Sequence, residues 1–355
     1  MPKPLKIGFI GVGGIANAHL STLKKFQEKD AKVPAFEIVC GSDPNEEARD
    51  NAKEKYDIEH LYSDYEDMLS KHDLDAVSIC TPNHLHMAPT VAAFEKGMHV
   101  MVEKPMARTV EECETMIAAG EKAKKQLMLG FQWRWHPQSR FIRKQVEEGV
   151  LGDVIYTRVQ AMRRRGIPNW GTFYSKEKNG GGPMIDIGVH LLELAVFLMG
   201  AKVPTPKRIA GNTWTYLGNK EDVAENMWPK WNYKEYTVED MAVGHVQFDN
   251  GSSLVIESSF AAHIKKDIYD VNVFGTKGGA HWEDGEVFTD MNGFMMDIKS
   301  GYLRDSDIWV EKMKHFVEVA AGERENQSSG YEGLAVQKIL NGIYDAAEAG
   351  KQIEL

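Results

Sequence analysis

A glycine-rich turn near the N-terminus is the feature that most constrains the fold of this chain. In "KIGFIGVGGIANAHL" an apolar, strand-length run ends at Gly11, and Gly13 and Gly14 open a segment with helical periodicity. The first glycine permits a tight turn, and the second lets backbone N–H groups, with those of Gly14 and Ile15, approach a pyrophosphate at the positive end of the helix. The turn therefore predicts a Rossmann-type dinucleotide site, with a purely structural glycine turn as the alternative.

The chain divides by sequence pattern into two parts. In the first part, short apolar runs alternate with amphipathic segments, which is the pattern of an α/β domain on a doubly wound parallel sheet. The strand-like runs lie at residues 6–11, 36–42, 75–81, 99–103 and 126–131. Later runs are longer and carry hairpin signals, most clearly at Asp249-Asn250-Gly251, which supplies the positive φ angles of a tight turn. A long helix is predicted from about Ile185 to Met199.

We therefore expect two domains. A dinucleotide-binding Rossmann domain is predicted over residues 1–131. An α+β domain for substrate binding and oligomerisation, built on a large, open, mostly antiparallel sheet, is predicted over residues 132–355. The closing helix of the chain could pack back on the first domain.

Composition limits the function further. The chain has 355 residues, 43% hydrophobic and 26% charged, as in an ordinary globular protein. Its formal net charge of −10 argues against a nucleic-acid surface, which needs a basic face. Three cysteines without metal-ligand spacing fit a reducing compartment, and neither a signal peptide nor a run of roughly 18 apolar residues is recognisable. We expect a cytoplasmic protein with no nucleic-acid or membrane partner.

Two loops after predicted strands complete the expected cofactor site. Asp43 follows the second strand, where this fold places the acid that binds the adenosine ribose; its charge favours NAD and disfavours NADP. A helix N-cap is the alternative role for Asp43. The loop "TPNHLHMAP" follows the fourth strand and is expected to lie over the cofactor through the set Thr81, Pro82, Asn83 and His86. Because no third residue lies at a metal-ligand spacing from His84 and His86, we predict no metal site.

The stretch "HVMVEKPMA" places charge at the end of a predicted buried strand. A glutamate and a lysine, Glu103 and Lys104, stand side by side where this strand ends, and Pro105 follows at once. A partly desolvated lysine has a lowered pKa and suits proton transfer near neutral pH. A solvated strand end is the alternative.

A second polar set lies in "GGGPMIDIGVH". Asp186 and His190 are four residues apart and would share one face of a helix, and the preceding glycines would let the backbone approach the site closely. Histidine is suited to accept a hydroxyl proton while hydride leaves the same carbon. A histidine in an apolar helix is otherwise more often a core residue.

Four segments in this order resemble the glucose-fructose oxidoreductase / inositol dehydrogenase / rhizopine-catabolism (Gfo/Idh/MocA) family: "GFIGVGGIA", "TPNHLH", "VEKPMA" and "GGGPMIDIGVHLLELAVFLMG". The resemblance spans essentially the whole chain. It implies that Lys104 lies between the nicotinamide and the substrate and that Glu103 supports the local structure beside a commonly cis Pro105. It also implies that Asp186 binds the substrate and that His190 is the catalytic histidine. Which of Lys104 and His190 takes the proton stays open.

Aromatic and charged residues around these sets are the predicted pocket wall. Aromatic faces pack on the C–H faces of sugar rings while charged and amide groups bind hydroxyls. The candidates are Gln132 beside the cofactor, Trp133, Arg134, His136, Arg163, Arg164 and Trp170, with His263 as a weaker one. Each could instead be a core or solvated residue.

The predicted function is an NAD-dependent dehydrogenase of a secondary hydroxyl on a cyclic sugar, glycoside or polyol. Within the family, the chain looks most like members that oxidise ring carbon 3, such as glucoside 3-dehydrogenases and levoglucosan dehydrogenase. The alternatives are an inositol dehydrogenase, a glycoside-cleaving enzyme that oxidises its substrate transiently, and a non-enzymatic NAD-dependent sensor. The resemblance also implies a homodimer or homotetramer.

Overall fold

The computed structural model describes residues 3–28, 32–200, 203–304 and 306–355, which form two compact units. The first unit contains the chain up to Gln132 together with Ser306–Leu334. The second contains the chain from Trp133 to residue 304 together with Ala335–Leu355. Residues 306–334 thus belong to the first unit, although they follow the sheet of the second unit in the sequence.

The first unit is built on a six-stranded parallel sheet in the order β3-β2-β1-β4-β5-β6. This is the Rossmann strand order, so the predicted fold is confirmed for this unit. Its strands are β1 (Leu5–Ile10), β2 (Phe36–Ser42), β3 (His60–Tyr62), β4 (Ala76–Ile79), β5 (His99–Val102) and β6 (Leu127–Leu129). The short β3 was not predicted, because three residues are too few to show an alternating pattern.

Helices cover both faces of this sheet. The helices α1 (Gly14–Glu28), α2 (Glu46–Tyr56) and α9 (Ile308–Ala320) contribute to one apolar cluster with β1 and β5. The helices α3 (Tyr65–Lys71), α4 (Met87–Glu95) and α5 (Val110–Ala123) pack against one another on the other face. The edge strand β6 is closed by the segment before α10, because Leu129 N–H donates to Ser328 O at 2.7 Å.

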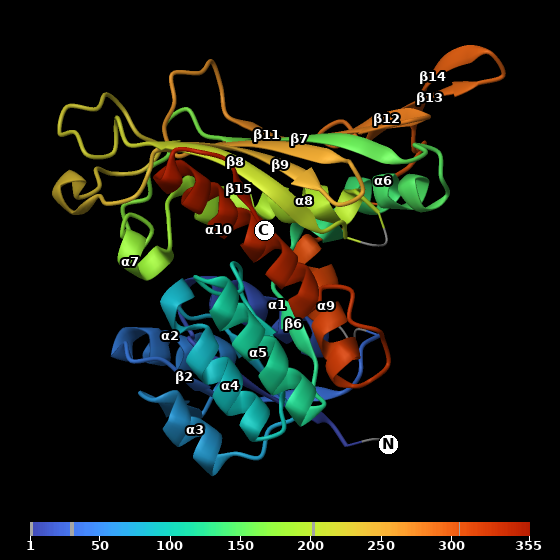
Figure 1. The fold of residues 1–355 in the computed structure, drawn as a ribbon. Coiled ribbons are helices and arrows are strands. Elements are labelled where there is room, and N and C mark those ends of the chain that lie inside the picture. The colour runs from blue at the N-terminus through green and yellow to red at the C-terminus, as the bar shows by residue number, and fades with distance from the viewer. Residues whose placement is uncertain (1–2, 29–31, 201–202, 305) are drawn as a thin grey trace. The chain divides into compact units, whose positions relative to one another are not determined.

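The second unit is built on a nine-stranded sheet in the order β14-β13-β12-β11-β7-β10-β9-β8-β15. Only β10 pairs with β7 in parallel, so the predicted mostly antiparallel sheet is confirmed. The predicted hairpin is also confirmed, with Gly251 at φ 83° between β9 and β10. The strands are β7 (Val154–Met162), β8 (Pro206–Trp214), β9 (Met241–Phe248), β10 (Ser253–Ser259), β11 (Ile268–Gly275), β12 (Gly278–His281), β13 (Glu286–Met291), β14 (Phe294–Lys299) and β15 (Ile353–Glu354). Figure 1 shows β13 and β14 as a hairpin that extends beyond the rest of this sheet.

Helices cover one face of the second sheet. The helix α8 (Val189–Leu198) packs on β7 and β11, and α6 (Pro137–Glu147) packs beside it. The helix α10 (Gly330–Ala349) brings Ile343 so close to β8 that a side chain at Gly211 would lie 2.3 Å from its carbonyl oxygen. The short elements are η1 (Asn83–Leu85), η2 (Trp133–Trp135), α7 (Lys176–Asn179) and η4 (Tyr233–Glu235).

The predicted helix from Ile185 to Met199 is not α-helical throughout. It starts with a π-helical turn, η3 (Met184–Gly188), and continues as α8. The helical stretch Lys176–Leu198 is long and apolar enough to cross a membrane by length and composition alone. Its apolar window is 89% buried inside the protein, as expected for a core helix.

Candidate active site

The carboxyl edge of the first sheet gathers every residue predicted to contact the cofactor. The glycine turn follows β1, Asp43 follows β2, the loop from Thr81 follows β4, Lys104 follows β5, and Gln132 follows β6. Ligands of open α/β sheets bind at this edge, where the strand order reverses between β1 and β4. The residues predicted to bind the cofactor, all of which lie in the first unit, are Gly11, Gly13, Gly14, Ile15, Asp43, Thr81, Pro82, Asn83, His86, Glu103, Lys104 and Gln132.

The glycine turn has the shape that a pyrophosphate requires. Gly11 has φ 82°, and a Cβ there would lie 2.8 Å from Cys80 O, so no other residue fits. At Gly13 a Cβ would meet only Asp43 at 3.9 Å, and at Gly14 it would meet nothing within 4 Å. The backbone at the start of α1 is therefore uncovered, which suits the binding of an anion by N–H groups of the first helical turn. The residues present fit a dinucleotide.

Asp43 supports the glycine turn as well as offering a carboxylate. Val12 N–H donates to its Oδ2 at 3.1 Å, and Asn45 N–H donates to its Oδ1 at 2.9 Å. The alternative role of Asp43 as the N-cap of α2 is wrong. The cap is Asn45, whose side chain accepts from Glu47 N–H and Ala48 N–H, because the helix begins two residues later than that role requires.

His86 is buried and does not present its ring at the surface. Its Nδ1 lies 2.8 Å from Pro105 O and its Nε2 lies 2.9 Å from Thr81 O. Burial lowers the pKa of His86 and outweighs these backbone hydrogen bonds, which raise it. His86 thus ties the loop after β4 to the turn after β5. It stands at the N-terminus of α4, but its side chain does not cap that helix.

Lys104 is the one residue between Val100 and Ala107 that is not buried. The Lys104–Pro105 peptide bond is cis, as the resemblance implied. Glu103 is buried, and its Oε2 accepts from the Lys104 N–H at 3.3 Å. The end of β5 therefore exposes a single lysine above a buried carboxylate.

Asp186 and His190 show the same arrangement in the second unit. Between Gly181 and Met199 they are the two residues that are not fully buried. The π-helical turn carries Asp186, and the first turn of α8 carries His190. Such turns occur frequently at functional sites. The predicted shared face is therefore confirmed, although the local helix type differs.

Two of the other predicted pocket residues, Trp133 and Arg163, lie beside this pair. The ring of Trp133 stacks on His190 with centroids 6.1 Å apart, and Arg163 Nη1 lies 3.9 Å from Asp186 Oδ2. Tyr269 connects Arg163 with Trp133, because Arg163 Nε donates to the Tyr269 hydroxyl at 2.9 Å and the Tyr269 ring lies 6.1 Å from the Trp133 ring. The second unit thus holds these residues in one polar and aromatic wall.

Trp170 continues this wall at the surface. It is 46% exposed, and its ring meets Trp228 edge-on at 4.7 Å. Trp228 in turn lies under the Arg163 guanidinium at 5.1 Å. Sequence reasoning missed Trp228 and Tyr269, because they reach the wall from segments far away in the chain.

Some predicted roles are corrected by the structure. Arg134 is 1% exposed and donates through Nε to Glu193 at 2.8 Å, so it is a core ion pair and not a substrate contact. The glycine run before Asp186 makes room for other parts of the protein: a Cβ at Gly181 would lie 2.2 Å from the Tyr344 hydroxyl, and one at Gly182 would lie 2.4 Å from the backbone carbonyl oxygen of Glu239.

Glu239 is a further residue that the sequence did not reveal. Its buried carboxylate accepts from Gly182 N–H at 2.9 Å and from the Tyr344 hydroxyl at 2.7 Å. Burial raises the pKa of Glu239 and outweighs these hydrogen bonds, which lower it. Glu239 thereby holds the start of the π-helical turn that presents Asp186.

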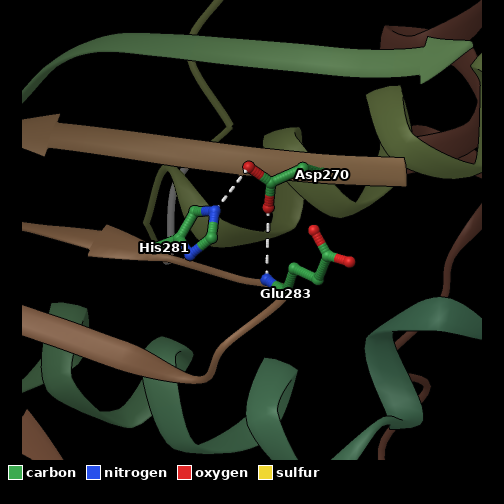
Figure 2. Close-up of side chains that lie close together, drawn as sticks. All are labelled: Asp270, His281 and Glu283. Atoms are coloured by element: carbon green, nitrogen blue, oxygen red, sulfur yellow. Dashed lines mark hydrogen bonds and ion pairs between the residues drawn. The ribbon is translucent and has the colours of Figure 1, made fainter. Parts of the chain in front are cut away.

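A separate cluster on the second sheet contains Asp270, His281 and Glu283 (Figure 2). His281 Nε2 lies 2.8 Å from Asp270 Oδ2, and its Nδ1 lies 2.8 Å from Asp284 Oδ2. Glu283 N–H donates to the other oxygen of Asp270 at 3.1 Å. Hydrogen bonds account for the closeness of these groups, and we assign no metal to them.

The fold of the first unit and these polar sets define an NAD-dependent oxidoreductase that acts on CH–OH groups. Comparison with known proteins agrees. Residues 5–131 match the description "Oxidoreductase family, NAD-binding Rossmann fold", and residues 139–281 match "GFO/IDH/MocA C-terminal domain". The chain therefore belongs to the Gfo/Idh/MocA family.

Individual relatives cover nearly the whole chain. The D-glucoside 3-dehydrogenase of Escherichia coli (strain K12) is 32% identical over 99% of this chain and 98% of its own. The myo-inositol 2-dehydrogenase of Thermotoga maritima is 26% identical over 90% of this chain and 89% of its own. A structure of levoglucosan dehydrogenase in complex with NADH, 22% identical, superimposes with a TM-score of 0.84 over 99% of each chain and shows the same fold.

Proposed function

We propose that this protein oxidises a secondary hydroxyl of a D-glucoside, at ring carbon 3, to the ketone. One observation carries the catalytic part: Lys104 and the Asp186/His190 pair are the partly exposed polar residues in two otherwise buried runs. Burying the neighbours fixes each backbone and leaves these side chains to meet a substrate. The identity to D-glucoside 3-dehydrogenase supports the substrate class and the ring carbon.

Each side chain has a distinct role in the proposal. The reaction removes a hydride from the carbon and a proton from its hydroxyl, and bound NAD supplies the hydride acceptor. Lys104 and His190 are the two groups that could take the proton. Asp186 and Arg163 bind neighbouring hydroxyls, and Trp133 and Trp170 pack on the sugar ring.

The test is turnover of purified protein with NAD and methyl glucosides, levoglucosan, and myo- and scyllo-inositol. NADH absorbance should rise fastest with a glucoside. Lys104→Met and His190→Asn should each lower kcat by roughly 10²- to 10⁴-fold while NADH still binds. Unchanged activity in both variants would refute the site assignment.

Small-molecule rescue separates the two proton acceptors. If His190 takes the proton, added imidazole should restore part of the activity of His190→Ala. If Lys104 takes it, added methylamine should do the same for Lys104→Ala. Release of a free aglycone without net NADH would instead identify the glycoside-cleaving alternative.

We also propose that the protein is a cytoplasmic homodimer or homotetramer. Exposed apolar side chains on the β13–β14 hairpin support the assembly, with Phe294 71% and Met295 91% exposed in the single chain. Light scattering after size-exclusion chromatography should give two or four times the chain mass. A monomer at micromolar concentration would refute this part.

A further inference from the structure

A buried cluster of charged and polar groups lies beneath the turn that carries Lys104. Its centre is Glu103, and its other charged member is Lys312 from α9, which is 0% exposed. Lys312 Nζ donates to Glu103 Oε1 at 2.7 Å, and 209 residues separate the two along the chain. Both belong to the first unit.

Contacts on both oxygens hold the Glu103 carboxylate in place, and Lys312 has further partners of its own. Glu103 Oε1 also lies 3.1 Å from His19 Nε2, and its Oε2 accepts from the Lys104 N–H at 3.3 Å. Lys312 Nζ lies 3.3 Å from Gly130 O and 4.4 Å from the centre of the Trp309 ring. One carboxylate oxygen therefore lies against two buried nitrogens and accepts from one of them, Lys312 Nζ, and the other oxygen holds the backbone of Lys104.

The electrostatics agree with an ionised Glu103 and a neutral His19. Burial alone would raise the pKa of Glu103, but Lys312 and His19 outweigh it and lower that pKa far below its usual value. Burial, followed by the charge of Lys312, lowers the pKa of His19 to about 4. A neutral His19 can accept at Nδ1 from the Ser78 hydroxyl, 3.1 Å away, while its Nε2 faces Glu103.

Stability does not explain such a pair. Lysine is almost never fully buried, and a buried ion pair is often no more stable than apolar residues of similar volume. What the pair does provide is a carboxylate in one defined position. Gly130 leaves room for the carboxylate in this position, since a Cβ on Gly130 would lie 2.3 Å from Glu103 Oε1.

We propose that Lys312 is a positioning residue for Lys104: it fixes the Glu103 carboxylate, which in turn holds the Lys104 backbone at the end of β5. This inference rests on the proposed function, in which Lys104 meets the substrate. The helix α9, far from β5 in the sequence, thereby sets the geometry of the reacting group without touching the substrate.

The first test replaces the buried charge. Lys312→Met should lower the kcat of the folded protein at least tenfold, with the Kd for NADH changed by less than about threefold. Lys312→Arg, which keeps the charge, should recover part of the loss. The control is Lys314→Met on the same helix, where the lysine side chain is 36% exposed, and it should behave as the wild type. Normal kcat in a Lys312→Met protein whose only defect is a lower Tm would overturn the proposal.

Two further variants keep the test decisive if Lys312→Met fails to fold. Glu103→Gln with Lys312→Met leaves no unpaired buried charge, and it should fold and still turn over at least tenfold more slowly. Gly130→Ala displaces the carboxylate without changing any charge, and it should give the same loss of kcat. Gly301→Ala is its control, because a Cβ there meets nothing within 4 Å. Wild-type kcat in both folded variants would contradict the proposal.

A readout without substrate separates this inference from the proposed function. Crystal structures of the wild type and of Gly130→Ala should show the Lys104 backbone displaced in the variant. If the wild type turns over no sugar or polyol, the proposed function fails, and this displacement still tests the positioning role. An unmoved Lys104 in the variant would refute that role whatever the wild-type activity.

Discussion

Some residues of this protein have a structural role and others are proposed to act in the chemistry, and the two kinds look alike in the sequence. Lys104 and Lys312 are both lysines near a carboxylate, yet Lys104 is partly exposed and Lys312 is fully buried. Arg134 and Arg163 both stood among the predicted sugar contacts, yet Arg134 is a core ion pair while Arg163 lies beside Asp186. Burial and partners separate the structural residues from the chemical ones.

Asp43 supports the glycine turn and is predicted to select NAD by its charge, and a single substitution can separate these two roles. Asp43→Asn keeps an oxygen that accepts from Val12 N–H but removes the negative charge that disfavours a 2′-phosphate. We expect the preference for NADH over NADPH to fall about tenfold, or about 1.4 kcal/mol. Fluorescence titration with both reduced cofactors measures it, with Tm as the check on the fold. An unchanged preference would show that Asp43 only supports the glycine turn.

At the scale of elements, local pattern predicted the strands and loops well, because glycines, alternation and helical periodicity act over a few residues. The glycine turn and the hairpin at Gly251 both formed as expected. Long-range partners could not be predicted from one sequence. Lys312 lies 209 residues from Glu103, and Arg163 meets Tyr269 across 106 residues. No local pattern encodes such pairs.

The π-helical turn offers a test of how an element presents a site. Gly182→Ala would place a Cβ 2.4 Å from Glu239 O and so shift the start of the turn that carries Asp186. We expect KM for the sugar to rise and kcat to fall, roughly tenfold each, while the Kd for NADH stays unchanged because the cofactor set lies in the first unit. The control is Gly301→Ala, because a Cβ there has open space around it. Gly200→Ala also lacks such a neighbour, but its φ of 130° makes it a poorer match. Unchanged KM and kcat would show that the position of this turn does not affect the site.

At the scale of the whole molecule, the buried cluster of the first unit predicts how stability depends on pH. The pKa of His19 falls from 6.5 in the unfolded chain to about 4 in the fold, so over this range the unfolded chain binds a proton that the fold does not. The His19 contribution is therefore a loss of about 3 kcal/mol of stability as the pH falls from 6.5 toward 4. Glu103, whose pKa is also lowered, acts in the same direction at still lower pH.

The check is denaturant unfolding of the wild type and of His19→Gln between pH 7 and pH 4. The wild type should lose stability more steeply over this range, by an amount close to the His19 contribution. His99, whose pKa burial also lowers to about 4, is common to both proteins, so the difference isolates His19. Parallel curves would mean that His19 is not held neutral in the fold.

The central claim is that hydride leaves a ring carbon of a glycoside and passes to NAD under the control of Lys104 and His190. Incubation of the protein with NAD and methyl β-D-glucoside deuterated at carbon 3 tests it most directly, with the reduced cofactor analysed by proton NMR. We predict a monodeuterated dihydronicotinamide, together with a 3-keto glucoside, and none of either from Lys104→Met. Reduced cofactor without deuterium, or none at all while NAD binds, would contradict the claim.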